Sequence, residues 1–333
     1  MKSDGITIKE IADLLNMSGS TVSRVLSGKA KKFRISSETE ELVKKTAKEH
    51  NYRPNQIARN LRLQKSNTIG LVIPDISNPF FCNLALKIET ELRAQGKLIL
   101  LCDTHDDSKI EKESIELLID RQVDGLLVAP VGLKGDHFKN LSKPVVMIDR
   151  YFEELDIPFV STNNFSSSYE ATKLLLENGH TRISCVQGVE STISNRERVN
   201  GYKSALQDSD KNIIEVIGSD FTIENGYKSA LKLFENSQKP TAIFSLSNQI
   251  TIGVMKAARE LGLKIPDDLS LISFDDQPYF ELTEPAITSV RQPVERIGKK
   301  AVQMLFELME GKECKSTLID AKLISRESVQ RSE

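Results

Sequence analysis

Short hydroxyl side chains and one arginine are predicted to share the polar face of a helix near the start of the chain. They are Ser20, Thr21, Ser23 and Arg24. Hydroxyls of this size can reach DNA phosphates or base edges, and the forked guanidinium of arginine can bind O6 and N7 of guanine. The opposite face carries Val22, Val25 and Leu26 at helical spacing. The pattern predicts a DNA-reading helix, and its alternative is an ordinary helical hairpin with a solvated polar face.

Two neighbouring predicted helices would hold this one in place. Thr7 can cap a first helix, whose apolar positions are Ile8, Ile11, Ala12 and Leu15. Met17, Ser18 and Gly19 form a turn, after which Ser20 or Thr21 begins the second helix. A third helix is predicted over residues 36–51, with Ser36 or Ser37 as its N-cap. Two short amphipathic helices around a tight turn are typical of a helix-turn-helix, so Thr7, Ser18 and Gly19 join the candidate DNA contacts.

Charge is divided unevenly along the chain. Residues 1–65 contain 14 Lys and Arg against 7 Asp and Glu, whereas the rest holds 31 of the 45 basic and 40 of the 47 acidic residues. Residues 1–65 are therefore basic and suited to binding a polyanion, whereas the rest of the chain is acidic. The densest basic run is GKAKKFR, residues 28–34. Lys31 and Lys32 in this run are predicted to contact DNA phosphates, and a plain solvated loop is the alternative.

Length and composition narrow the class of protein. The chain has 333 residues, of which 39% are hydrophobic, and it is long enough for two or three domains. No apolar run reaches the roughly 18 residues that span a bilayer, and the start lacks the apolar segment of a signal peptide, so a cytoplasmic protein is expected. The four cysteines and four histidines are scattered. This predicts no disulfide framework, no metal site and no cofactor.

From Thr68 onward, short apolar runs alternate with amphipathic stretches, as a parallel sheet with crossover helices requires. The runs predicted as strands are 69–74, 98–102, 125–129, 145–149, 183–186, 213–217, 242–245 and 269–274. The stretches predicted as helices are 80–95, 109–121, 167–178, 196–207, 224–235, 249–261 and 294–309. This doubly wound α/β pattern binds ligands at the carboxyl ends of its strands. The sequence shows no glycine-rich phosphate loop, nucleophile elbow or nucleophile–base pair, so an enzyme is not favoured.

Motifs that run along the whole chain carry a family resemblance. The chain reads TIKEIADLLNMSGSTVSRVLSG from Thr7, then ISSET, then YRPNQIARNLR from Tyr52. Further motifs are IGLVIPDISNPFF, DGLLVAP, PVVMIDR, VSTNN, the RxRxxGY of residues 196–202, SFDD and ITSVRQP. With these the chain closely resembles the lactose-repressor (LacI) family of bacterial transcription regulators.

The resemblance implies a domain plan. A three-helix head would occupy residues 1–53, a hinge helix and linker 54–66, and a periplasmic-binding-protein-like type I core 67–333. The core would contain two doubly wound parallel-sheet subdomains. The first would consist of 67–161 and 291–321, and the second of 162–290 and 322–333.

The resemblance also implies ligand contacts in the core. Arg198 matches a family arginine that grips ligand hydroxyls or carboxylates, Asp275 an aspartate that accepts from sugar hydroxyls, and Phe80 and Phe81 a pair that often packs against a sugar or purine face. Core packing is the alternative for Phe80 and for Phe81. Asn163 and Ser247 depart from the usual VSxDN and ND patterns. Both changes would make the cleft less acidic, which together with Arg150 and Arg198 mildly favours an anionic ligand.

For the segment that follows the head, the resemblance implies DNA contacts by Asn55, Ala58 and Leu61. Leu61 matches a leucine that wedges between central base pairs in the minor groove. A helix of about two turns is marginal in water, so this hinge is expected to form only on the operator.

Together these features predict a DNA-binding transcription regulator, a repressor of carbohydrate-use genes that binds a palindromic double-stranded operator. Its effector would be a sugar, sugar acid or phosphosugar, and a purine is the alternative ligand. The sequence lacks the apolar heptads that tetramerise some relatives, so a homodimer is expected. A free-standing solute-binding receptor is the alternative class, and the basic head and missing signal segment argue against it.

Overall fold

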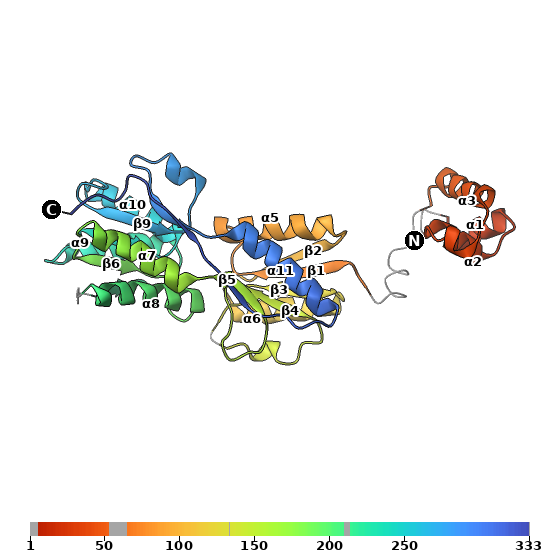
Figure 1. Cartoon of the computed structure of the whole chain (residues 1–333), viewed down its shortest axis with the longest axis horizontal. Helices are drawn as coiled ribbons and strands as arrows, with labels where there is room; N and C mark the ends of the chain where they lie inside the picture. The colour runs from red at the N-terminus through yellow and green to blue at the C-terminus, as the bar shows by residue number, and fades with distance from the viewer. Residues whose placement is uncertain (1–5, 53–64, 133, 210–213, 333) are drawn as a thin grey trace. The chain divides into compact units, whose positions relative to one another are not determined.

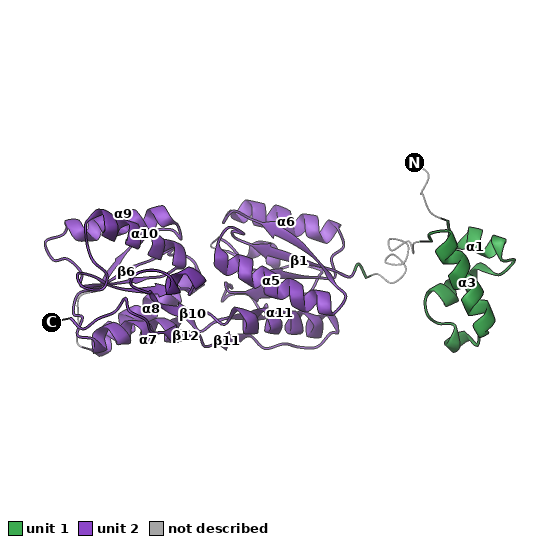
Figure 2. Ribbon diagram, turned by 90° about the horizontal axis from the view of Figure 1, so that it is seen from above, with its two compact units in different colours: residues 1–66 green, residues 67–333 purple. Residues whose placement is uncertain are grey.

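A computed structural model of the chain describes residues 6–52, 65–132, 134–209 and 214–332. The chain divides into two compact units, residues 1–66 and residues 67–333, which are called the head and the core below (Figure 2). Across the described ranges, we find no helix with the length and apolar character needed to cross a membrane.

Over its described residues 6–52, the head folds into three α-helices and a short 3-10 helix. They are α1 (Ile8–Leu14), α2 (Gly19–Leu26), η1 (Lys31–Phe33) and α3 (Ser37–Glu49). The helix α2 begins at Gly19 and not at Ser20 or Thr21 as predicted, because the Ser18 hydroxyl accepts from the Thr21 amide and acts as the N-cap. The third helix begins after Ser36, as predicted, and ends at Glu49. A small core holds the helices together, formed by Ile11, Ala12, Val22, Val25, Ala30, Val43 and Ala47.

The core is built on two six-stranded sheets of the same topology (Figure 1). The first has the order β11-β5-β4-β3-β1-β2, with β1 (Thr68–Ile73), β2 (Leu98–Asp103), β3 (Gly125–Val128), β4 (Val145–Ile148), β5 (Phe159–Thr162) and β11 (Thr317–Ile319). The second has the order β12-β10-β9-β8-β6-β7, with β6 (Ile183–Val186), β7 (Glu215–Ile217), β8 (Ala242–Ser245), β9 (Ser270–Phe274), β10 (Thr288–Arg291) and β12 (Lys322–Ile324). Among the described strands, β10 and β12 pair antiparallel and the other pairs are parallel. The core is therefore the doubly wound α/β fold that the sequence predicted.

Helices cover both faces of each sheet. The first sheet packs against α5 (Pro79–Ala94) and α11 (Val294–Met309) on one face and α6 (Ser108–Asp120) on the other. The second packs against α7 (Asn164–Glu177) and α8 (Ile193–Asp208) on one face and α9 (Ile223–Glu235) and α10 (Asn248–Glu260) on the other. Because both faces are covered, central strands such as β3 and β4 are buried at every residue.

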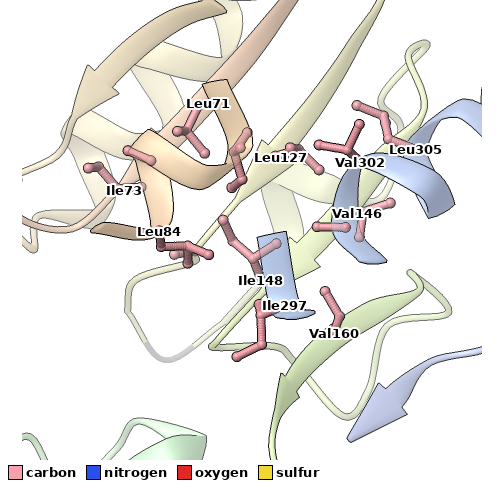
Figure 3. Close-up of a cluster of buried hydrophobic side chains, with 14 of the residues drawn as sticks. Leu71, Ile73, Leu84, Leu127, Val146, Ile148, Val160, Ile297, Val302 and Leu305 are labelled. Carbon is pink, nitrogen blue, oxygen red and sulfur yellow. The ribbon is translucent and has the colours of Figure 1, made fainter. Parts of the chain in front are cut away.

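Figure 3 shows the apolar cluster between the first sheet and the helices α5 and α11. Leu71, Val146 and Ile148 on the strands meet Leu84 on α5 and Ile297 on α11. This packing fixes the carboxyl ends of β1 and β4, and with them the residues that follow each strand. Against the second sheet, α9 and α10 approach closely at Gly253, where an added Cβ would clash with the Ile223 carbonyl oxygen.

Candidate functional site

The candidate DNA-reading residues lie on the exposed side of α2. Ser20 and Arg24 are exposed, and Thr21 and Ser23 are half-buried. The Ser18 hydroxyl lies 2.8 Å from Ser20 Oγ and 2.8 Å from Thr21 Oγ1. Gly19 has nothing within 4 Å of the place where a Cβ would be, so its backbone is open to an approaching phosphate. The structure therefore brings the predicted residues together on one accessible surface.

Thr7 belongs to a capping box at the start of α1. Its amide donates to Glu10 Oε2 at 2.7 Å, and the Glu10 amide donates back to Thr7 Oγ1 at 3.3 Å. The hydrogen bonds from Thr7 lower the pKa of Glu10. Thr7 thus fixes the first turn of α1 through an exposed polar cap, which leaves its hydroxyl near the surface.

The basic run between α2 and α3 forms the short helix η1. Lys31 and Lys32 are exposed there, as a phosphate contact requires. The guanidinium of Arg24 lies over the ring of Phe33, a residue that the sequence reasoning did not single out. The predicted hinge contacts Asn55, Ala58 and Leu61 lie outside the described residues.

In the core, a cavity of about 330 Å³ opens where the strands of the two sheets end. Its lining combines aspartates, arginines and aromatic rings from both sheets. The lining residues are Pro74, Asp75, Asn78, Phe80, Phe81, His105, Asp106, Asp149, Arg150, Ser194, Arg198, Asp220, Phe221, Thr222, Ser247, Asp275 and Gln292. Six of the seven predicted effector contacts are among them. We call this cavity the cleft.

Two aspartates occupy matching places in the cleft. Asp149 follows β4 and Asp275 follows β9, and both adopt left-handed backbone conformations, with φ of 61° and 70°. Asp275 Oδ1 accepts from Gln292 Nε2 at 2.6 Å. Asp149 Oδ1 is buried and has no hydrogen-bond partner among the described residues. An unpaired buried acceptor is costly, so this atom is suited to a donor brought by a ligand.

Burial controls the ionisation of these aspartates. It raises the pKa of Asp149 to about 6, although the positive charges of Arg198 and Arg150 act in the opposite direction. Burial also raises the pKa of Asp275, against the opposing charge of Arg198 and the hydrogen bond from Gln292. Buried carboxylates with raised pKa values are typical of ligand sites.

Arg198 on α8 is 4% exposed and is held from two sides. Its Nε donates to Asn164 Oδ1 at 2.8 Å, and one terminal nitrogen donates to the Leu246 carbonyl at 2.9 Å. Its guanidinium also lies 3.7 Å above the Phe274 ring. Burial lowers the pKa of Arg198. In the described structure it forms no direct ion pair with Asp149 or Asp275, so all three groups can face a ligand between them.

Arg150 is fixed on the other side of the cleft. It donates to Asp106 Oδ1 at 2.7 Å. Its guanidinium carbon lies 5.7 Å from the Phe81 ring centroid and 5.8 Å from that of Phe221. Phe81 lies on α5 beside the first sheet, and Phe221 lies between β7 and α9 of the second, so Arg150 lies between aromatic rings from both halves of the core.

Of the remaining predicted contacts, three line the cleft and one, Asn163, does not. Phe80 and Phe81 line the cleft but are only 6% and 4% exposed, and they also belong to the core of the first sheet. The core packing is observed, and the contact with a ligand stays a prediction. Ser247 lines the cleft and caps α10 by accepting from the Ile250 amide. Asn163 does not line the cleft. It caps α7 and donates to Asp320 Oδ1 at 2.9 Å.

The cleft is more acidic than the sequence reasoning held. Five aspartates line it against two arginines. Since Asn163 lies elsewhere, its neutral side chain does not reduce the acidity of the cleft. One of the four grounds for an anionic ligand is therefore absent, while Ser247, Arg150 and Arg198 do line the cleft, and the ligand's charge stays a prediction. The five carboxylates could also accept from the hydroxyls of a neutral ligand. The described residues contain no group of three or more His, Cys, Asp or Glu that could hold a metal ion.

Comparisons with known protein families agree with this two-part organisation. Residues 7–55 match the model of bacterial regulatory proteins of the lacI family, and residues 172–329 match a periplasmic binding protein-like domain. The chain is 34% identical over 329 residues to the ribose operon repressor of Halalkalibacterium halodurans, covering 98% of both chains. It is also 34% identical over 332 residues to the transcriptional repressor CytR of Escherichia coli K12, covering 97% of this chain and 96% of that one.

Solved structures resemble the chain in the same way. The lac repressor dimer bound to operator and an anti-inducer superposes with a TM-score of 0.89 at 22% identity, covering 98% of this chain and 99% of that one, which shows the fold. A LacI family transcriptional regulator from Enterococcus faecium with bound ribose superposes with a TM-score of 0.74 at 28% identity. That match covers 80% of this chain and 100% of the other.

Proposed function

The chain belongs to the lacI family of bacterial regulatory proteins, and from this premise we propose that it is a sequence-specific repressor released or strengthened by a neutral sugar in the cleft. The observation that carries the proposal is the presence, in one chain, of an exposed Arg24 on a capped DNA-reading helix and of a buried cleft with an unpaired carboxylate oxygen. The enzyme and receptor alternatives explain the cleft but not the basic head. A protein that binds operator DNA acts in the cytoplasm of a bacterium.

Within this proposal, a pentose such as ribose is the first effector to test. The cleft supplies acceptors at Asp149 and Asp275, a forked donor at Arg198, and flat rings at Phe81 and Phe221. A pyranose or furanose offers hydroxyl donors to the acceptors and an apolar face to the rings. A relative named for the ribose operon and a solved neighbour with bound ribose support the same choice.

The edge of the first sheet supports the proposed homodimer. The edge strand β2 exposes Leu98 by 72% and Leu100 and Leu101 by 41% and 40%, and neighbouring helices expose Leu86 by 58% and Leu117 by 51%. A row of apolar side chains at a sheet edge marks an association surface. A second copy of the chain would cover this row and give the two-fold symmetry that a palindromic operator requires.

The test begins with operator selection. The full-length protein selects duplexes from a random-sequence DNA pool, and its affinity for the selected duplex is measured with ribose, ribose 5-phosphate or hypoxanthine present. We expect a palindromic consensus and a response to ribose alone. Binding without sequence preference would overturn the repressor proposal, and a response only to the phosphosugar or the purine would overturn the choice of a neutral sugar.

A further inference from the structure

An aromatic ring in the basic loop of the head lies against the candidate base-reading arginine. Cζ of Arg24 on α2 is 4.1 Å from the centroid of the Phe33 ring on η1. This is well inside the roughly 6 Å over which a guanidinium is attracted to an aromatic face. Phe33 is 43% exposed, and Arg24 is exposed as well. The pair therefore lies on the surface of the head and not in its core.

The backbone of the loop fixes where this ring lies. The Lys29 amide donates to the Arg24 carbonyl at 2.9 Å, which ties the start of the loop to α2. The Phe33 amide then donates to the carbonyls of Lys29 and Ala30, both at 3.2 Å, and Ala30 is buried in the small core of the head. The ring is thus anchored, through a chain of backbone bonds and one buried methyl group, to the same helix that carries Arg24.

The exposure of Phe33 is the feature to explain. A phenylalanine that served only to stabilise the head would be expected in the cluster with Ile11 and Val22, where burial of its apolar surface gains most. Phe33 instead covers one face of the Arg24 guanidinium, which makes no hydrogen bond or ion pair with any residue that the structure describes. An exposed arginine samples many rotamers, and fixing it on a base costs conformational entropy. A ring beneath the guanidinium reduces that cost before DNA arrives.

We propose that Phe33 is a positioning residue for sequence recognition, whose ring holds Arg24 in place to bind one base while Lys31 and Lys32 contact phosphates. The proposal rests on the proposed DNA-binding function and assigns separate tasks to adjacent residues of one short helix. Phe33 would add to specificity, and the two lysines to affinity for any sequence.

The test is a double-mutant cycle in the full-length protein. Affinities for the selected operator and for a random duplex are measured for the wild type, Phe33→Leu, Phe33→Tyr, Arg24→Ala and the Arg24→Ala/Phe33→Leu double variant. We expect Phe33→Leu to weaken operator binding about two- to fivefold, the size of an exposed cation–π contact, without changing binding to the random duplex. Phe33→Tyr keeps the ring and should bind like the wild type. In the Arg24→Ala background, Phe33→Leu should have no further effect.

Four results would overturn the inference. Additive losses in the cycle would mean that Phe33 contacts DNA independently of Arg24, and equal losses on both duplexes would mean that it has no part in specificity. Tighter operator binding by Phe33→Leu would mean that the ring withholds Arg24 from DNA, and unchanged binding would mean that the ring has no effect. Thermal melting of each variant checks that the head is folded, and Phe33→Met replaces Phe33→Leu if the leucine variant unfolds. A wild type without sequence preference would instead refute the proposed function.

Discussion

The head and the core keep their candidate binding side chains in opposite environments. In the head, Ser20, Arg24 and Lys31 are exposed over a small apolar core. In the cleft, Arg198 and Asp275 are 4% and 5% exposed, and each is held by hydrogen bonds to its surroundings. The difference follows from the ligands. DNA phosphates release counterions when they meet exposed cations, whereas a small neutral ligand gains affinity only where water is excluded and donors and acceptors are already placed.

Because of this difference, experiments can distinguish DNA binding by the head from ligand binding in the cleft. Binding to the head should depend strongly on salt, because it neutralises phosphates. Binding to the cleft should respond to the loss of single buried groups and to pH, and little to salt.

Replacing Arg198 with methionine should produce the largest loss. The change removes the donor to Asn164 and Leu246 and leaves Asp149 and Asp275 facing each other in a buried site without their main counter-charge. We expect affinity for ribose to fall at least about 100-fold, equivalent to about 3 kcal/mol, while operator binding persists without response. Titration calorimetry measures the affinity.

Arg196→Met on the same helix is the matched control. Arg196 forms an exposed ion pair with Glu153 and should contribute little to ribose affinity. Unchanged ribose affinity in Arg198→Met, or equal losses in both variants, would contradict the assignment of Arg198 as the buried anchor of the cleft.

Arg24→Ala should have the next largest effect, and it acts on the head alone. We expect a loss of about 1 to 3 kcal/mol on the selected operator, with specificity relaxed at one base pair and random-duplex binding little changed. The Lys31→Ala/Lys32→Ala variant is the contrast. It should weaken both duplexes alike and reduce the slope of log affinity against log salt by about 2. If Arg24→Ala weakened both duplexes equally, its role in base reading would be refuted.

Much of the fold was predictable because its signals are local. Helix α11 spans the predicted residues 294–309, since a strong apolar stripe marks it. Helix α7 begins at Asn164, three residues before the predicted start, because the Asn163 cap precedes the apolar stripe. The short strands β11 and β12 have three residues each and lie in the crossings between the sheets, so periodicity alone does not mark them.

The residues that line the cleft could be predicted only where they belong to a recognisable sequence motif. The resemblance pointed to Arg198 and Asp275, and Asp149 was marked only by its place at the end of a predicted strand. Phe221 and Gln292 were missed, because they reach the cleft only after separate strands have paired. The neighbours Asn163 and Asn164 show the limit most clearly. Asn164 bonds the buried Arg198, whereas Asn163 caps the helix one residue earlier and lies outside the cleft. A shift of one residue at a helix start decides which side chain faces inward.

The third prediction concerns pH and acts on the cleft alone. Burial raises the pKa of Asp149 to about 6, so in the free protein this carboxyl becomes protonated as pH falls from 7.5 to 5. We expect ribose affinity to fall about tenfold over that range, because the ionised oxygen is the better acceptor.

The raised pKa of Asp149 has the opposite effect on the stability of the core, which should increase as pH falls. Since the folded state binds the proton more tightly than the unfolded state, the contribution of Asp149 to core stability improves as pH falls below 6.

Asp149→Asn provides the control for this pH dependence. The amide oxygen can still accept a hydrogen bond but does not titrate, so the variant should lose most of the change between pH 7.5 and 5 that arises from this residue. Asp275 also has a raised pKa and faces the same ligand. An unaltered pH profile in Asp149→Asn would show that Asp149 is not the responsible group.

The smallest predicted effect compares the two units directly by removing one helix cap from each. The Ser36 hydroxyl caps α3 in the head by accepting from the Thr39 amide at 3.2 Å, and the Asp107 carboxylate caps α6 in the core by accepting from the Lys109 and Ile110 amides. Ser36→Ala and Asp107→Ala should each cost about 1 kcal/mol of unfolding free energy. The shift in melting temperature scales inversely with the unfolding entropy of the unit, so Ser36→Ala should lower the head transition by about 4 to 8 °C and Asp107→Ala the core transition by about 2 to 4 °C or less. Calorimetry of the full chain should then show each variant moving only its own transition. A single transition that moves equally in both variants would mean that the head and the core unfold together, and that the contrast in their binding environments does not extend to independent stability.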